Sequence, residues 1–536
     1  MQTTPTMIYK CLTRLFVLVV MLEFSQTSCS QAKSQGSEVI YHVFQRSFYD
    51  SNGDLQGDLN GLKEKLSYLQ ELGITSILLL PLYESPYYHN YFSSDFEKID
   101  TEYGSMNDYL NLVKEIHKRG MKIYLDMETQ YVTEDHVWWK DSYGNLNSKY
   151  SDYVLYDDSA HKKPSTIVFD LTELPGYDGT RRKITTVNLK SENVIEYNYR
   201  LFEFFTDPNH DGKFDDGADG FRIDHMMDNL DNKPQLKNLF SSFWAPLISR
   251  LKKRNPELKF VAEQADWASF GFDYLQRGGV DGVFAFRLMF AIRNMNKKEI
   301  VTMADSIFNF TPPGKQQIVF IANHDLDRFS SVIHQSAGKE KIGAALNLLI
   351  GGIPSIYYGQ EIGMVGTTSW NKYGLTDANG IPQREAFEWY RSVSGKGMAT
   401  WYKNTGPWWD STNLKANDGI SVEEQKTDPN SLWSFYRKLI ALRKNNEAFF
   451  KGDYQTLRND NDSVYCFVRY TDRKAAVVSV NLSSARQTTG VSIENMKASV
   501  KSGQWKNLLG HGTAKPAQGG IMISLPAYGI QVWEIL

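Results

Sequence analysis

The chain has 536 residues, of which 41% are hydrophobic and 23% charged, and its formal net charge is -3. This length suggests three or four structural units, one of which could be a large barrel. The small net charge gives no electrostatic basis for binding nucleic acid. The chain also contains 12 Trp and 30 Tyr. Such rings suit sugar faces, although core packing explains most aromatic side chains in any protein.

The first 29 residues have the pattern of an export signal. Lys10 and Arg14 precede the apolar run 15–22, and small residues follow it. Because this run is too short to cross a bilayer, we expect a signal peptide over residues 1–29. Cys29 follows Thr-Ser, as at a lipoprotein cleavage site. We therefore expect an exported protein, which is periplasmic, extracellular or attached to the outer membrane through a lipidated Cys29.

From about residue 38, short apolar runs alternate with amphipathic helical patterns. This alternation is typical of βα units around a parallel sheet. One helical stretch places leucines at helical spacing from Leu62 to Leu72 and ends before Gly73. Eight runs are candidate strands, which predicts an α/β fold built on a (β/α)8 barrel. They are residues 39–44, 76–80, 122–126, 220–224, 259–263, 282–286, 318–322 and 355–357.

Two regions depart from this alternation. Residues 131–190 are polar and rich in Tyr, Asp, Ser and Lys, which predicts an inserted domain B after the third strand. The barrel is then expected over residues 37–130 and 191–449. Residues 450–536 show only short alternating strands, which predict a C-terminal all-β sandwich.

Carboxylates stand at the ends of several predicted strands. Asp126 ends the third, Asp224 the fourth and Glu263 the fifth, while Asp325 follows the seventh. The C-terminal strand ends of a (β/α)8 barrel converge on one face, where active sites are built. A single acid there could be a helix N-cap, but four on one rim predict a catalytic cleft. Crowding raises the pKa of at least one carboxyl, which yields the protonated acid and ionised nucleophile that glycoside cleavage needs.

Four segments, in the same order along the chain, resemble the conserved regions of the α-amylase superfamily, glycoside hydrolase family 13. Each motif is short, but four in sequence on their expected strands are a specific signal. The segments are Gly220-Phe221-Arg222-Ile223-Asp224, Val261-Ala262-Glu263, Phe320-Ile321-Ala322-Asn323-His324-Asp325 and Gly352-Ile353-Pro354-Ser355-Ile356-Tyr357-Tyr358-Gly359-Gln360-Glu361.

The resemblance implies a retaining α-glucan hydrolase. Asp224 would attack the anomeric carbon, Glu263 would protonate the leaving oxygen and later activate water, and Asp325 would hold sugar hydroxyls in the transition state. Arg222 would keep Asp224 ionised, unless it forms only a structural ion pair. The other substrate-binding residues that we expect are His324 as a donor to the same sugar, Tyr91 as its stacking floor, and His89, Phe92, Asp126, Tyr131 and Arg328.

Two departures from the family pattern affect these expectations. Gln130 and Tyr131 replace an Asn and a His that follow the third strand in the family. That Asn is a calcium ligand and that His touches the reactive sugar, so the usual calcium site is in doubt and the sugar contact passes to Tyr131. Asp228 stands four residues after the nucleophile, where a His is frequent, which leaves the contacts on the leaving-group side open.

Two loops have oxygen side chains at alternate positions, as calcium loops do. The first follows the first strand, and its alternative interpretation is an Asn-Gly turn on a solvated loop. The second opens like an EF-hand loop but lacks the Glu at its twelfth position. Calcium is therefore the expected cofactor, with candidate ligands Asp50, Asn52, Asp54, Gln56 and Asp58 in the first loop and Asp207, Asn209 and Asp211 in the second.

The sequence favours an endo-acting α-amylase that cuts α-1,4-glucan in starch and malto-oligosaccharides. Phe92 follows Tyr91 where exo-acting glucosidases carry an Asp that holds the chain end. An exo-acting α-glucosidase or a glucosyltransferase with the same catalytic residues stays an alternative. A non-catalytic glucan-binding protein is the remote alternative. Such a protein would have lost one of the three acids, and all three are present here. Trp138 and Trp139 either line the cleft or form the core of domain B.

Overall fold

The computed structural model describes residues 37–369, 372–494, 496–497, 504–510, 512–517 and 519–535. The expected signal peptide and Cys29 lie outside these residues. Within them, no helix has both the length and the apolar character that crossing a bilayer requires.

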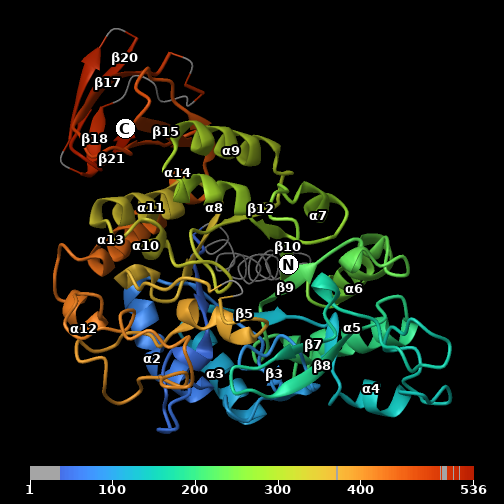
Figure 1. The fold of residues 1–536 in the computed structure, drawn as a ribbon. Coiled ribbons are helices and arrows are strands. Elements are labelled where there is room, and N and C mark those ends of the chain that lie inside the picture. Colours follow the sequence, from blue (N-terminus) through green and yellow to red (C-terminus); the bar gives the residue numbers. More distant parts are fainter. Residues whose placement is uncertain are drawn as a thin grey trace, which may run out of the picture.

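Eight parallel strands form a closed barrel in the centre of the molecule (Figure 1). All eight strands predicted from the sequence are present, and the first and the last pair with each other to close the barrel. In their order around the barrel the strands are β1 (Ile40–Val43), β13 (Ile353–Tyr357), β12 (Gln316–Val319), β11 (Gly282–Phe284), β10 (Lys259–Gln264), β9 (Gly220–Met226), β5 (Lys122–Met127) and β2 (Ser76–Leu79).

Helices surround this barrel. Helix α2 (Leu59–Leu72) shows why they form where they do: the Asp58 side chain accepts the Gly61 N–H at its start, and Gly73 ends it in the left-handed conformation with φ 102°. The other helices of six residues or more are α3 (Met106–Lys118), α4 (Val137–Ser142), α5 (Glu192–Thr206), α6 (Ala245–Arg254), α8 (Phe286–Arg293), α9 (Lys297–Phe310), α11 (Ala337–Leu349) and α13 (Leu432–Asn445). Shorter ones are α7 (Phe272–Gln276), α10 (Phe329–Val332), α12 (Val422–Gln425) and α14 (Glu447–Phe450).

Two strands end earlier than the sequence predicts. Strand β11 stops at Phe284 because α8 begins at Phe286. Strand β12 covers residues 316–319, so the apolar residues 320–322 belong to the loop beyond it. These residues are buried even though they are not in a strand, and an apolar run alone does not distinguish the two cases.

Domain B leaves the barrel after β5, as predicted. Its sheet has the order β6 (Tyr131–Thr133), β8 (Arg181–Thr186) and β7 (Glu173–Pro175). Trp138 and Trp139 are buried, and Trp138 packs against Phe96 and Tyr153, so the core alternative is correct for this pair. Strands β3 (Tyr83–Glu84) and β4 (Asp95–Ile99) form an antiparallel pair, and Ser93 between them bridges to Val132 in β6.

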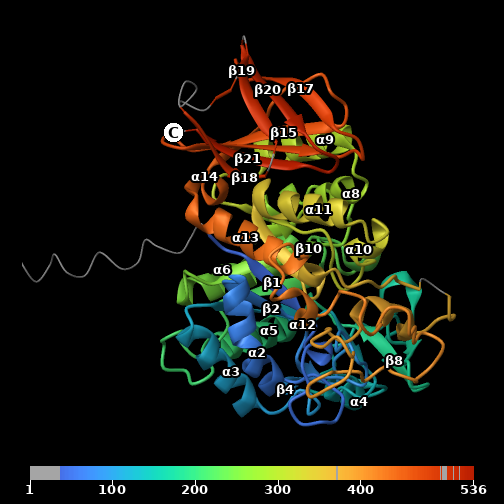
Figure 2. The same ribbon diagram turned by 90° about the vertical axis from the view of Figure 1, so that its left-hand side faces the viewer.

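The C-terminal region forms two antiparallel sheets at the opposite end of the molecule from domain B (Figures 1 and 2). Buried residues from both sheets, among them Val477 and Ile523, share one core, and Cys466 is a buried free cysteine within it. Arg469 donates to the Ile350 carbonyl at 3.1 Å and so fixes the domain to the barrel. One sheet contains β14 (Asp453–Thr456), β15 (Val464–Tyr470), β16 (Ala475–Asn481), β21 (Ile530–Ile535) and β18 (Trp505–Leu509), and the other β17 (Gln487–Ser492), β20 (Gly520–Leu525) and β19 (Thr513–Ala517).

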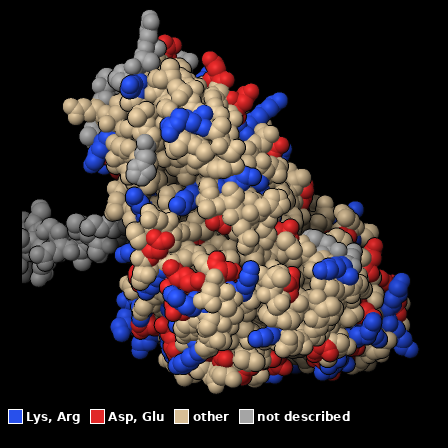
Figure 3. All heavy atoms as spheres, turned by 60° about the vertical axis from the view of Figure 1, so that its left-hand side comes forward, with Lys and Arg blue, Asp and Glu red and all other residues tan. Residues whose placement is uncertain are grey.

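Charged side chains of both signs are interspersed on the face shown in Figure 3. This distribution agrees with the small net charge of the sequence.

Candidate active site

A cleft of about 590 Å³ opens at the C-terminal ends of the barrel strands, beside domain B. Its walls include all three predicted catalytic acids, Asp224, Glu263 and Asp325. Asp224 lies in β9 and Glu263 in β10, two neighbouring strands that bring the two carboxyls to one rim. The volume is in the range of cavities that bind drug-sized ligands, so there is room for more than one sugar.

Arg222 connects the carboxylates from beneath. It stands two residues before Asp224 on β9, and side chains at that spacing point to the same face of a strand. Its guanidinium donates to Asp224 Oδ1 at 2.7 Å, to Glu263 Oε2 at 2.8 Å and also to Asp126. Arg222 and Asp126 are almost completely buried and do not line the cleft. The structure therefore gives both residues a supporting position under the acids and no direct contact with the cleft.

Tyr91 and His324 form the floor of the cleft. The Tyr91 hydroxyl donates to Asp126 Oδ2 at 2.7 Å and lies 2.7 Å from His324 Nε2, and the two rings stack with centroids 5.4 Å apart. Burial lowers the pKa of His324 well below its usual value, and the positive charge of Arg222 lowers it further. The imidazole is therefore neutral near pH 7, and its Nε2 lies between the Tyr91 hydroxyl and Asp325 Oδ2, which is 3.2 Å away.

Asp224 and Glu263 contact the same guanidinium and influence each other's ionisation. Burial raises the pKa of Asp224 well above its usual value, and the charge of Glu263 raises it further. Burial also opposes ionisation of Glu263, but Arg222 and the hydrogen bond with Asp224 outweigh it and lower the Glu263 pKa. Because each carboxyl affects the ionisation of the other, the proton titrates with the pair and not with one residue.

Asp325 lies opposite the pair, in the loop after β12. Arg384 donates to Asp325 Oδ1 at 3.2 Å, to the Tyr88 hydroxyl at 2.9 Å and to the His324 carbonyl at 2.8 Å. Burial raises the pKa of Asp325 to about 6, and the charge of Glu263 contributes to this rise while Arg384 opposes it. Arg384 thus holds Asp325 in place as a partly protonated acid.

Most of the expected substrate-binding residues line the cleft, but Arg222 and Asp126, which lie beneath it, and Arg328 do not. His89, Tyr91, Phe92, Tyr131 and His324 all belong to its wall. Arg328 begins helix α10, donates to the Tyr358 carbonyl at 2.7 Å and packs over the rings of Tyr357 and Tyr358.

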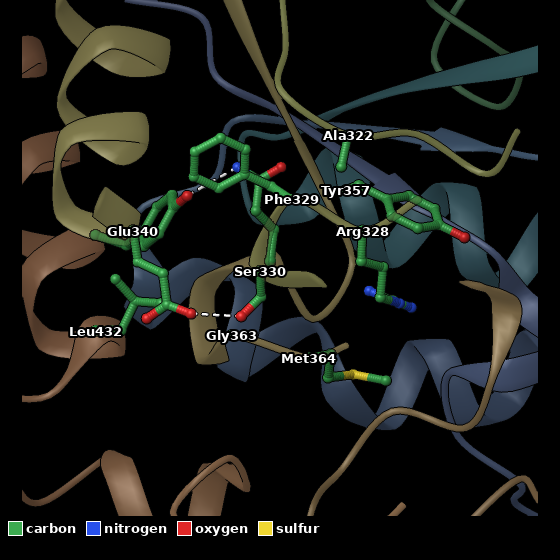
Figure 4. A pocket seen from close by; sticks show the side chains of 11 residues that line it. Ala322, Arg328, Phe329, Ser330, Glu340, Tyr357, Gly363, Met364 and Leu432 are labelled. Atoms are coloured by element: carbon green, nitrogen blue, oxygen red, sulfur yellow. Dashed lines mark hydrogen bonds between the residues drawn. The ribbon is translucent and has the colours of Figure 1, made fainter. Parts of the chain in front are cut away.

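Arg328 instead lines a separate cavity of about 10 Å³, the size of one water molecule, shown in Figure 4. The prediction that Arg328 binds substrate is therefore wrong in its placement. The start of α10 turns the Arg328 side chain into the core.

Several residues of the cleft were not predicted from the sequence. Trp267 donates to Glu263 Oε1 at 3.2 Å, and its position four residues after Glu263 was a possible signal. Arg384 and Asp377 come from the long segment after β13, where no strand pattern points to them. Phe169, at the tip of domain B, is 82% exposed and also lines the cleft.

The first predicted calcium loop forms a tight curl. Asp50 accepts the backbone N–H groups of Asn52, Gly53 and Leu55, and the Asn52 amide donates to Asp54 at 3.1 Å. Each carboxylate has four lone pairs and the Asn52 amide oxygen has two, so Asp50, Asn52 and Asp54 can still offer oxygens to a cation. These three residues fit calcium.

The remaining candidate ligands of the first loop have other partners. The Gln56 oxygen faces Arg46, and both Asp58 oxygens accept hydrogen bonds from Ser51, with Asp58 also capping α2. These contacts make Gln56 and Asp58 weaker candidates than the other three.

The second loop repeats this curl around Asp207, Asn209 and Asp211. Asp207 accepts the N–H groups of Asp211 and Gly212, and Asn209 Oδ1 accepts the N–H of Asp211. However, Arg254 lies 3.4 Å from Asp207, where it competes with a cation. Among the described residues there is no group of three or more His, Cys, Asp or Glu side chains arranged to hold a metal.

Comparison with known families and proteins agrees with this geometry. Residues 42–452 match the family model for the alpha amylase catalytic domain, and residues 454–532 match that for the maltogenic amylase C-terminal domain. Similar proteins include Alpha-amylase 3 of Dictyoglomus thermophilum, which is 29% identical over 448 residues, 82% of this chain and 84% of the relative. Probable oligo-1,6-glucosidase 3 of Bacillus subtilis is 26% identical over 524 residues, 83% of this chain and 90% of the relative.

The fold is shared with a solved structure. The crystal structure of an α-amylase from H. orenii superposes with a TM-score of 0.76 at 26% identity, covering 94% of this chain and 100% of the other. Because the similar proteins carry different activity names, their likeness to this chain does not determine its substrate.

The position of the three acids predicts that each is essential for turnover. We expect Asp224→Asn, Glu263→Gln and Asp325→Asn to lower kcat on an α-glucan by about 10³-fold or more, since groups that act in the transition state have such effects. Circular dichroism should show unchanged folding. Substrates with a good leaving group should be spared in Glu263→Gln, because they need less help from an acid. Near-normal turnover of Asp224→Asn would overturn the assignment.

The raised pKa of Asp325 predicts the acidic limb of the pH profile. Only the ionised carboxylate accepts hydrogen bonds from sugar hydroxyls at both oxygens, and burial raises its pKa to about 6. We expect kcat/KM for a malto-oligosaccharide to fall as the pH decreases through about 6. A pH–rate series in a constant-ionic-strength buffer measures this limb. A profile that stays flat down to the ordinary carboxyl range would contradict the prediction.

Proposed function

Because the chain belongs to the α-amylase family of glycoside hydrolases, we propose that it is a retaining, endo-acting hydrolase of α-1,4-glucan in starch and malto-oligosaccharides. The family is shown by the match over residues 42–452. The finer specificity rests on the cleft.

The cleft geometry supports a double-displacement reaction. Asp224 would attack the anomeric carbon while Glu263 gives its proton to the leaving oxygen, and Glu263 would then take a proton from water that releases the sugar from Asp224. Arg222, in contact with both, stabilises whichever carboxyl is ionised at each step. Two inversions at the anomeric carbon keep the α configuration.

Phe92 is the observation that carries the endo-acting specificity. Its ring lines the cleft, packed edge-on against Tyr131 with centroids 6.2 Å apart. An apolar ring cannot hydrogen-bond a terminal sugar, and leaving a buried hydroxyl unpaired costs roughly 1–3 kcal/mol. A chain that continues past this point loses no such bond. The exposed Phe169 offers a further ring over the same cleft.

An exo-acting α-glucosidase is the second candidate, and Asp377 is the observation that favours it. This carboxyl lines the cleft, is 8% exposed, and neither oxygen has a hydrogen-bond partner among the described residues. Burial raises its pKa to about 8. Asp377 could hold the terminal hydroxyls of a glucan chain, which Phe92 cannot. A glucosyltransferase would use the same acids and differ only in the acceptor.

We also propose that calcium binds at the first loop. Asp50, Asn52 and Asp54 would hold it, and its role would be structural, since the loop follows β1 and precedes α2. An ion that binds only the folded state raises the free energy of unfolding. The second loop is the weaker candidate because Arg254 lies beside Asp207.

Export of the protein stays a proposal that rests on residues 1–29. Release after cleavage and attachment through a lipidated Cys29 are its two forms, and metabolic labelling with a fatty acid would distinguish them.

The products from long amylose test the endo-acting proposal. We expect rapid viscosity loss and a spread of short malto-oligosaccharides with the α configuration at the new reducing end. Chromatography would identify the products, and polarimetry would report their anomeric configuration. Glucose as the sole early product, with little change in viscosity, would show exo-action and favour the role of Asp377. Transfer products at low substrate concentration would indicate a glucosyltransferase.

The calcium proposal predicts an effect of chelation on stability. A chelator should lower Tm, and Asp54→Ala should remove that effect while activity below the melting range is retained. Asp54 is the variant to test because Asp58 caps α2, and its loss would lower stability without any metal. Asp211→Ala in the second loop is the matched control. Equal Tm values with and without chelator, after exhaustive metal removal, would count against the proposal.

A further inference from the structure

His225 occupies an unusual position in the cleft wall. It directly follows Asp224 and its backbone adopts φ 41°, a conformation that non-glycine residues hold only when their surroundings enforce it. Its N–H donates to Glu263 Oε2 at 3.3 Å, and its side chain lines the cleft. The residue therefore adjoins both the nucleophile and the acid.

Two other residues fix the His225 ring. Its Nε2 lies 3.0 Å from Asp231 Oδ1, and the Tyr131 hydroxyl donates to the other oxygen, Oδ2, at 2.7 Å. Tyr131 also packs against the His225 ring with centroids 6.0 Å apart. Asp231 itself has a positive φ of 49°. The segment thus contains two residues with a positive φ, and the hydrogen bond from Tyr131 connects it to the start of domain B. These constraints hold the imidazole in one orientation.

This arrangement determines which ring nitrogen is free. An ionised Asp231 only accepts hydrogen bonds, so it requires the proton on His225 Nε2. In the neutral ring Nδ1 then carries a lone pair. Nδ1 makes no hydrogen bond to any residue in the part of the chain that the structure describes, which leaves it for a ligand.

Asp228, where a His is frequent in related sequences, cannot take this role. Its Oδ1 accepts the Phe240 N–H at 2.8 Å and its Oδ2 lies 2.7 Å from Arg277. It does not belong to the cleft wall. The contacts on the leaving-group side, which the sequence left open, must come from another residue.

We propose that His225 binds the sugar on the leaving-group side by accepting a hydroxyl proton at Nδ1, with Asp231 and Tyr131 as positioning residues. Glu263 protonates the oxygen that joins the two sugars, and the His225 backbone contacts Glu263 while its ring lines the same cleft, which brings the ring within reach of the sugar that departs. This inference rests on the proposed hydrolysis of α-glucan.

Two substrates separate this contact from the rest of catalysis. Maltotetraose has a leaving sugar, whereas α-maltosyl fluoride loses only fluoride and places no sugar on the leaving-group side. His225→Asn is the variant of choice, because Asn tolerates a positive φ and avoids the strain that Ala would introduce. Asp228→Asn, three residues further on, is the matched control.

His225→Asn should lower kcat/KM for maltotetraose about tenfold, the usual effect of one lost hydrogen bond to substrate, and that for α-maltosyl fluoride less than about threefold. Asp231→Asn and Tyr131→Phe should show the same selectivity with smaller losses. Asp228→Asn should leave the ratio of the two rates unchanged. The glycosyl-enzyme formed from α-maltosyl fluoride should also transfer less to added glucose, relative to water, in His225→Asn. A merely structural role of His225 would not change that partition.

Equal losses of His225→Asn on both substrates, with unchanged transfer to glucose, would overturn the inference while leaving the hydrolase assignment intact. Failure of the unmodified enzyme to cleave either substrate would instead refute the proposed function itself.

Discussion

The active site depends on one buried guanidinium. Arg222 donates hydrogen bonds to Asp126, Asp224 and Glu263, which lie in three neighbouring strands. Its side chain is almost completely buried. Without this guanidinium, three carboxyls would face each other in a low-dielectric site. Desolvation and mutual repulsion would then oppose the ionisation of each carboxyl. Its single positive charge does not neutralise all three, so one proton stays within the group. That shortage of positive charge is what supplies an acid and a nucleophile in the same cleft.

The barrel makes this arrangement possible because parallel strands β5, β9 and β10 are neighbours and end at the same rim. The loops beyond the strands then add side chains that position the acids and line the cleft. Arg384, from the segment after β13, fixes Asp325, and Asp231 orients the His225 ring in the cleft wall. The framework and the specificity thus come from different parts of the chain.

The sequence predicted the framework well. All eight strands, domain B and the C-terminal sheets follow from hydrophobic periodicity, and the acids follow from their place at strand ends. The sequence could not predict Arg384 and Asp377, because they come from an irregular segment whose path depends on tertiary packing. The Arg328 prediction failed for a related reason, because the sequence does not show that the side chain turns into the core at the start of α10. The spacing of residues also does not show that Asp58 caps α2 or that Gln56 faces Arg46, because these roles depend on hydrogen-bond partners.

The closure of the barrel has a consequence for how the chain acquires its structure during synthesis. Strand β1 pairs with β13, so Tyr41 lies beside Ile356 although most of the chain separates them. Contacts of such long range form slowly, and the barrel cannot close before the ribosome has passed the eighth strand. Until then the early strands lack a partner on one side, and Arg384 is not yet available to Asp325. The active site therefore cannot be complete until the chain as far as Arg384 is available to fold.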